Sequence, residues 1–467
     1  MKKEDEIIQL FARHSNFFWN WILNYYPLKE ELVREHHKEM DFSALSQNEN
    51  IHWSESLLYD FSDSWNMEFL SKNSSIPWTE HLLLNYPYKF NRNNLSINPS
   101  LPWSEDFINR YEHVWNYNWL VSNKGIRWTE NLLLDPKIID AGISDIHAPQ
   151  ILTKDFIRKH MDTLCLEDLT RNVSVKWDND FIEELSPLFK HQEWKGISSN
   201  QSIKFTYDQI ERLTQKSDKN EGLDWKSLSA NPSVCFQQSD ILRRYKQNWD
   251  WRSLTMNKGV GFNIDQLKEF ESLIKWKTSD SLSNNTISFS GSVKWNEEII
   301  DVFKDKWDWW FLSQNEFISW NDKLIKKYND QFNWKSFALN KNGPFNLDFV
   351  LKYENNLIKS NRLTASKRNY DLLFKNILND ALIEKLIQIQ HNPYIQYHHK
   401  NLSKHHEILN NNFKSLLENI LILDTKEYLY TDDFHRIDET LSEIQTLMVH
   451  LSEKEENIKT PKFNKLR

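Results

Sequence analysis

Glycine is scarce in this chain of 467 residues, which contains only 8 of them. All lie between Gly125 and Gly343, and none falls in a G-x-G-x-x-G or G-x-x-x-x-G-K-[ST] arrangement. Loops that cradle nucleotide phosphates need glycine, because the backbone must approach the phosphate closely. The sequence therefore argues against most kinases, P-loop NTPases and Rossmann enzymes.

Cysteine and long apolar stretches are also nearly missing. Cys165 and Cys235 are the only cysteines, too few to cross-link a chain of this size and too far apart for a C-x-x-C pair. No stretch approaches the roughly 20 apolar residues of a membrane span. The apolar run from Phe17 to Leu23 is broken by Asn20, unlike a signal peptide. We therefore expect a cytoplasmic protein with no membrane segment.

Positive charge is outweighed as well, since 58 Lys and Arg face 66 Asp and Glu, a net charge of −8. Nucleic-acid binding needs clustered cations that release phosphate counterions. The overall charge disfavours that function, although a local basic groove stays open as an alternative.

Tryptophan, by contrast, is abundant, with 21 copies, and its spacing reveals an internal repeat. Four tryptophans from Trp53 to Trp128 are 25 residues apart, and the same step separates Trp295 from Trp320. Filling the interval gives twelve copies of one unit. Their anchor residues are Trp53, Trp78, Trp103, Trp128, Leu152, Trp177, Phe205, Phe236, Phe262, Trp295, Trp320 and Phe345.

Each anchor is followed by a helix N-cap residue and, five positions on, by an aliphatic residue that can pack on the anchor. This pattern predicts a helix of about three turns after each anchor. The cap residues are Ser54, Thr79, Ser104, Thr129, Thr153, Asp178, Thr206, Asn263, Asn296, Asn321 and Asn346, with Gln237 a weak substitute.

A second block, of the form L-S-x-N, precedes many anchors, as in Leu45–Asn48 and Leu228–Asn231. An aromatic residue or Met lies one helical turn before it, so the block predicts a short helix that ends at Asn. Asn suits a left-handed helix terminus and an Asx-turn. The unit is therefore a short helix, a tight turn and a longer helix.

A two-helix unit of this size cannot bury its aromatic face alone, so neighbours must stack. The predicted fold is all-α: an α-solenoid over residues 40–358, preceded by an N-terminal helical cap at 1–39. Most tryptophans then belong to the core and not to a ligand cage or base-stacking platform. Trp119 and Trp310 stand beside the consensus position, and we predict them as partner contacts.

Four of the spacings between successive anchor residues are longer than 25 residues, and the extra residues in such arrays usually form loops. The Ser-rich segment 278–292, which contains Phe289, is one of these. Two interpretations are open: a surface insertion without function, or a mobile insertion in which Phe289 contacts a partner.

The remaining residues follow another pattern. We expect a connecting helix within 359–397, from about Tyr370 to Ile389, and a coiled-coil-like helical hairpin at 398–467 that ends in a basic tail. The hairpin's apolar seam packs either within the chain or across a two-fold axis, and we favour a homodimer. The candidate seam residues are Phe413, Ile420, Phe434, Ile437, Leu441, Ile444, Met448 and Leu451.

Five histidines crowd the segment from His391 to His406. Spacing of seven could align three of them for a metal, but no H-E-x-x-H pattern or neighbouring Cys supports such a site. A protonation-sensitive seam is the alternative that we favour. Arg34–His37 and Arg110–His113 resemble nuclease motifs, but a repeat consensus or a solvated helix face explains them more simply. We therefore predict no catalytic residue, metal or cofactor.

The unit resembles the short Trp-rich helical repeats of uncharacterised proteins from bacteria and large DNA viruses, over residues 40–358. The whole layout also looks like that of pro-CRISPR accessory factors, which dimerise and clamp a type II CRISPR effector nuclease. These resemblances imply a non-catalytic, dimeric scaffold that holds a partner protein, such as a defence nuclease, and meets nucleic acid only through that partner. The alternative is a helical-repeat protein that binds nucleic acid directly.

Overall fold

The computed structural model describes residues 2–391, apart from 86–88, 216–221, 238–239, 278–285, 359–362 and 364. These described residues form short helices joined by tight turns, and the β pairing among them is one isolated bridge between Phe262 and Val293. The predicted all-α class is confirmed. The predicted dimer seam and four of the five clustered histidines lie outside the described residues.

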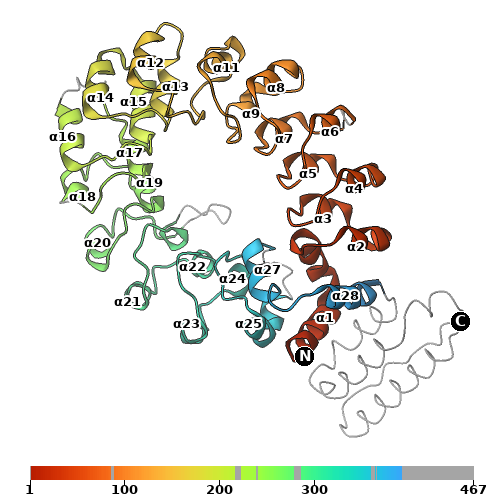
Figure 1. Cartoon of the computed structure of the whole chain (residues 1–467). Helices are drawn as coiled ribbons and strands as arrows, with labels where there is room; N and C mark the ends of the chain where they lie inside the picture. The colour runs from red at the N-terminus through yellow and green to blue at the C-terminus, as the bar shows by residue number, and fades with distance from the viewer. Residues whose placement is uncertain are drawn as a thin grey trace, which may run out of the picture.

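Successive helices alternate between the inner and outer rims of a ring (Figure 1). The helix that leads into each Asn turn lies on the inner rim and contacts the equivalent helix of the next unit. The inner helices are α3 (Phe42–Gln47), α5 (Met67–Lys72), α7 (Arg92–Ile97), α9 (Tyr117–Leu120), α15 (His191–Ser199), α17 (Trp225–Ala230), α19 (Trp251–Met256), α22 (Trp309–Ser313) and α24 (Trp334–Phe337). The same place in the chain order is taken by α11 (Pro136–Ala141), α13 (Leu166–Arg171), η3 (Ile287–Phe289) and α26 (Glu354–Leu357).

The helices that follow the anchors form the outer rim (Figure 1). They are α2 (Glu30–Glu35), α4 (Glu55–Asp60), α6 (Glu80–Asn85), α8 (Glu105–Arg110), α10 (Glu130–Leu133), α12 (Lys154–Lys159), α14 (Asn179–Leu185), α16 (Tyr207–Gln215), α18 (Ile241–Arg244), α20 (Ile264–Glu269), α21 (Glu297–Val302), α23 (Asp322–Lys327) and α25 (Leu347–Lys352). Two short 3-10 helices, η1 (His37–Glu39) and η2 (Ser186–Leu188), follow α2 and α14.

The predicted N-caps start these outer helices. The Ser54 hydroxyl, for example, accepts a hydrogen bond from the Leu57 amide at 3.0 Å, and every other predicted cap except Gln237 does the same in its own unit. Gln237 instead donates to the Val260 carbonyl at 2.6 Å. The prediction of about three turns was wrong, because most of these helices have six residues. In α4 the backbone leaves the helix at Phe61, and the chain folds back so that Trp65 packs on the anchor Trp53.

A ladder of buried asparagine side chains joins most units to the one before, although the units of α11 and η3 lack this Asn. The Asn98 amide donates to the carbonyls of Ser71 and Asn73 at 3.0 and 3.2 Å, and its oxygen accepts from the Ser100 amide at 3.0 Å. The same three bonds recur around the ring, with only small changes of partner, and each of these side chains is buried. The ladder comprises Asn48, Asn73, Asn98, Asn123, Asn172, Asn200, Asn231, Asn257, Asn315 and Asn340.

The expectation of a left-handed Asn was wrong, whereas the Asx-turn is present. Asn98 has φ −70° and ψ 117°, an extended conformation, and the other C-cap asparagines of this type are similar. The neighbouring serine adds a second link between units. Ser96 donates to the Arg92 carbonyl at 2.7 Å and accepts from the Asn116 amide at 2.9 Å, where the next inner helix begins.

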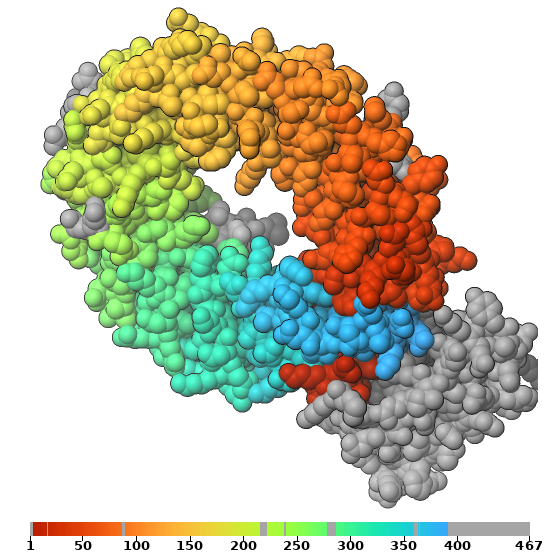
Figure 2. All heavy atoms as spheres, viewed as in Figure 1, coloured from red at the N-terminus to blue at the C-terminus, as the bar shows by residue number. Residues whose placement is uncertain are grey.

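The two ends of the described chain meet and close the ring (Figure 1). The long first helix α1 (Lys2–Tyr25) packs against α27 (Lys367–Leu373) and α28 (Asp380–His391). Arg13 and His14 both bind the Glu354 carboxylate at 2.8 Å, and these side chains are mostly buried. Figure 2 shows that the closed ring surrounds a central opening.

Closure changes the role expected for residues 1–39. The second half of α1 stacks on α3 like an inner helix, and Asn48 donates to the carbonyls of Leu23 and Tyr26, both at 2.8 Å. With α2 as its outer helix, this segment supplies a further stacked unit as well as the closing contact.

Two other expectations about segments were wrong. The predicted helix from Tyr370 to Ile389 is two helices, because the chain breaks at Phe374 and restarts where Asn379 caps α28. Residues 278–285 of the Ser-rich segment lie outside the described residues, but the rest of the segment is not a simple surface insertion. Residues 286–292 include η3 and stand in for an inner helix, since Ser288 accepts from the Asp308 amide at 2.9 Å.

We predict that Asn98→Asp lowers the free energy of unfolding by about 3 kcal/mol or more. The change removes the donor and leaves two buried carbonyls unpaired, at about 1–3 kcal/mol each. Urea denaturation measures the effect. The matched control is Asn118→Asp, at an exposed position on the inner rim, and equal losses in the two variants would contradict the role of the ladder.

The ring closure should depend on pH through Glu354. Burial opposes ionisation, but hydrogen bonds from His14 and Arg13 outweigh it and lower the pKa of Glu354 from 4.5 to about 2. A carboxyl whose pKa falls on folding stabilises the protein above its unfolded pKa, and the contribution is lost as pH falls toward the folded pKa. A shift of this size corresponds to about 3 kcal/mol.

Glu354→Gln should therefore be less stable than the original protein at neutral pH. The difference should shrink steadily as pH falls from about 4.5 toward 2. Urea unfolding at a series of pH values measures it. Glu68→Gln is the control, because Glu68 is exposed and lies 3.8 Å from a single partner, Lys72. A difference that does not change with pH would rule out the closure contact as its source.

Candidate binding surface on the inner rim

The inner helices leave a few positions free of the stacking contacts. In α17, Leu228 and Ser229 are buried and Trp225 packs on Trp249 at 5.0 Å. Lys226 and Ala230, one helical turn apart, are exposed. Because the buried side of the helix faces its neighbours and the outer rim, the exposed side faces the opening of the ring. The residues at these positions differ from unit to unit.

Trp119 is the most exposed tryptophan on this rim. It lies in α9, four residues before the ladder asparagine, and 45% of its surface is accessible. Ala44 and Ser253 occupy the same place in other units. The prediction that Trp119 stands outside the core therefore agrees with its exposure, and contact with a partner stays a prediction.

An open groove of about 410 Å³ runs between α7 and α9, close to Trp119 in the chain. Its walls combine aromatic and polar side chains, and Asn116 donates to Asn93 at 2.7 Å across the two helices. Burial raises the pKa of the Tyr117 hydroxyl, although Lys137 nearby opposes the shift, so this hydroxyl stays a neutral donor. The lining residues are Arg92, Asn93, Trp115, Asn116, Tyr117 and Asn118. Such a surface suits the amides and side chains of a polypeptide.

The other two predicted contact residues lie elsewhere on the ring. Trp310 belongs to α22 and is half-buried. Phe289 belongs to η3 and packs edge-on against Phe311, with the ring centroids 6.2 Å apart. The structure therefore does not bring the three predicted residues together, and Phe289 is part of the packed array and not the tip of a loop.

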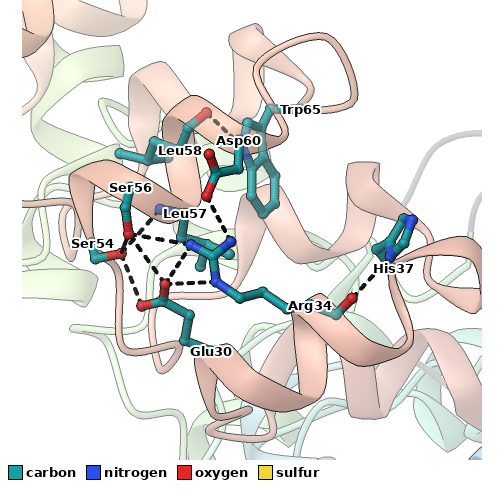
Figure 3. Close-up of polar contacts among 9 residues, drawn as sticks. All are labelled: Glu30, Arg34, His37, Ser54, Ser56, Leu57, Leu58, Asp60 and Trp65. Carbon is teal, nitrogen blue, oxygen red and sulfur yellow. Dashed lines mark hydrogen bonds and ion pairs between the residues drawn. The ribbon is translucent and has the colours of Figure 1, made fainter.

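The Arg34 motif forms a dense polar cluster on the outer rim (Figure 3). The Arg34 guanidinium lies between Glu30 and Asp60, with bonds of 2.6 Å to each carboxylate. Ser54 donates to the other oxygen of Glu30 at 2.9 Å, and Arg34 lowers the pKa of Glu30. These contacts join α2 to α4. Every charged group in the cluster is already paired, so it links units and presents no free acid or base.

Similar pairs join other outer helices. Arg110 contacts Glu80 at 2.9 Å, and Arg243 contacts Glu269 at 2.7 Å. Among the residues that the structure describes, no three His, Cys, Asp or Glu side chains gather as a metal site would require. None of the described helices is long and apolar enough to cross a membrane.

Sequence analysis missed two features of the inner rim. The first is the side-chain cap at the start of most inner helices, such as Asp41, which accepts from the Ser43 amide at 2.8 Å; α9 and α13, for example, lack one. An Asp or Asn directly before the aromatic residue of each block was a visible signal for it. The second is a row of cations at one repeat position, which aligning the units on their asparagines would have revealed.

Comparison of the chain with protein-family models, curated proteins and solved structures gives no match. A function for this chain can therefore be inferred only from the geometry of the ring.

Proposed function

We propose that this protein is a non-catalytic scaffold that binds a partner protein on the inner rim of its ring and pairs with a second copy through residues 398–467. One observation carries the proposal. In most units the same Asn, together with Ser or Thr and aromatic residues, holds the unit in place, while the side chains at the exposed positions of the inner helices vary more around the ring. A constant frame with a variable inner surface is suited to recognition.

The exposed Trp119 and its neighbouring groove support a protein partner more than a small molecule. The groove is open and shallow, whereas small-molecule sites enclose most of their ligand. Exposed tryptophans often dominate the energy of protein interfaces. The frame is also held by many buried hydrogen bonds, so a partner would lose little affinity to ordering the scaffold.

The identity of the partner is the next question, and a nuclease of a bacterial defence system is our first candidate. A tagged pull-down from the source cell, with and without nuclease treatment, tests it. A stoichiometric protein that survives the treatment would support the scaffold. Loss of every partner after the treatment would instead favour the alternative, direct binding of nucleic acid.

We predict that Trp119→Ala weakens the recovered complex by about 30-fold, because truncating a central tryptophan costs roughly 2 kcal/mol. Tyr59→Ala is the matched control, since Tyr59 is 70% exposed but lies on the outer helix α4. Isothermal titration with the purified partner measures both. If the two variants bind equally well, the partner does not use α9.

The proposed pairing through the C-terminal seam has its own test. Leu441→Lys with Met448→Lys would place two charges in the predicted apolar seam, and unpaired charges are costly to bury. We expect the full-length variant to run as a monomer in light scattering while the original chain runs as a dimer. A dimer that persists in the variant would contradict this seam, and the inner-rim proposal would still stand.

A further inference from the structure

A row of cations lies at one repeat position on part of the inner rim. The position is five residues before the ladder asparagine, and in α15, α17, α19 and α24 it is occupied by Lys or Arg. All four side chains are exposed. These residues are Lys195, Lys226, Arg252 and Lys335.

None of the four cations has an acidic partner among the side chains that the structure describes, whereas many cations of the outer rim do. Outer-rim cations such as Arg158 and Lys327 are paired with carboxylates at 2.7 Å or less. Within the described part of the chain, none of the four forms an ion pair or donates a side-chain hydrogen bond. Their charge is therefore available to a ligand in the opening.

The remainder of the ring is different at the same repeat position. At that position Ser43, Asn93 and Asn118 are neutral and Glu68 and Glu167 are acidic. Trp310 occupies it in α22 and separates Lys335 from the other three cations. The four cations therefore lie on the part of the ring formed by the inner helices from α15 to α24 (Figure 1). A polyanion that followed the whole rim would meet the two carboxylates.

Apolar side chains accompany the cations. Met256 follows Arg252 by four residues on α19, so these two lie on one helix face. Leu339 follows Lys335 by four residues and lies in the turn after α24. Leu339 is 37% exposed, and Met256 is partly accessible. The surface therefore offers a positive charge and an apolar contact side by side in two of its units.

We propose that the row of Lys195, Lys226, Arg252 and Lys335 binds an acidic, extended segment of the partner polypeptide. Adjacent packed helices lie about 8–10 Å apart, and an extended residue spans about 3.3 Å. A carboxylate at about every third residue would match Lys195, Lys226 and Arg252 on the consecutive helices α15, α17 and α19. Lys335 lies beyond η3 and α22 and would take a carboxylate further along the segment. Apolar residues between the carboxylates would contact Met256 and Leu339. This inference deepens the proposed function and depends on it.

A polypeptide fits these features better than a nucleic-acid strand does. Its charge can be confined to one short segment, as the row is confined to one part of the ring. A nucleic-acid strand carries charge along its whole length, and the net charge of this chain is −8. Binding of nucleic acid to the same row is therefore the competing outcome of the test.

The experiment compares two charge-reversed forms of the full chain. Lys226→Glu with Arg252→Glu changes the row, and Lys159→Glu with Lys268→Glu makes the same change of net charge on the outer helices α12 and α20. Lys159 and Lys268 are exposed. The probes are a fluorescein-labelled peptide of about 14 residues with Glu at every third position and Leu between, its Gln counterpart, and a labelled oligothymidine.

We expect the original chain and the outer-rim variant to bind the Glu peptide alike, and the inner-rim variant to bind at least about 10-fold more weakly. Affinity should fall as salt is added, because screening shortens the range of the charges. Binding of the Gln peptide at the same strength, equal losses in both variants, or preference for the oligothymidine would each overturn the proposal.

The same variants separate this inference from the proposed function. If the inner-rim variant still recovers the stoichiometric partner in the pull-down with undiminished affinity, the scaffold stands and the acidic segment is wrong. If the original chain recovers no protein partner at all, the proposed function fails, whatever the peptide shows.

Discussion

The architecture depends on the paired hydrogen bonds of the asparagine ladder. A carboxamide has two donor hydrogens and an acceptor oxygen, and here all are used: two carbonyls of the preceding unit and one amide of its own turn. Asp lacks the donors, and Ser has only one. Since these polar groups are buried, leaving one of them without a hydrogen-bond partner destabilises the folded state. Each turn is thereby held at a fixed distance from the previous one, and the units repeat with little variation.

The asparagines also explain how such short helices persist. Helices of four to six residues are unstable in isolation, because nucleation fixes several residues for one hydrogen bond. Here side chains replace missing helical bonds at both ends, as with Asn91, which caps the start of α7, and Asn123 of the next unit, which donates to the Ser96 carbonyl at its end. The aromatic anchors then bury the units against one another. Each helix is therefore stable only when it is packed within the array of units.

Features that depend on residues close together in the chain could be predicted from the sequence, whereas contacts between residues far apart in the chain could not. The caps and the Asn turns could be predicted because each depends on residues within one unit. The contact of Arg13 with Glu354 could not, since 341 residues separate them and neither stands at a consensus position of the repeat. Likewise, η3 lacks the L-S-x-N pattern, and its place is revealed by the bond that Ser288 accepts from the Asp308 amide and by the two that Asn315 donates to the Ser288 and Ser290 carbonyls. On the inner rim, the exposure of Trp119 could be predicted because this residue departs from the repeat consensus. Lys226 was not predicted as a surface residue of interest, because the repeat units were aligned on their anchor residues and not on their asparagines.

Closure into a ring has a consequence for recognition. The end units of an open array expose an apolar stacking face and must be capped with polar residues. Here α1 and α28 cover each other, with Tyr26 and Lys29 both bonded to Asp380 at 2.7 and 2.6 Å. A closed ring also fixes the curvature, because adding or removing one unit would separate these ends. The inner side chains therefore keep constant positions across the opening. Binding specificity can then reside in the choice of residue at each inner position, without the entropy cost of arranging a flexible surface.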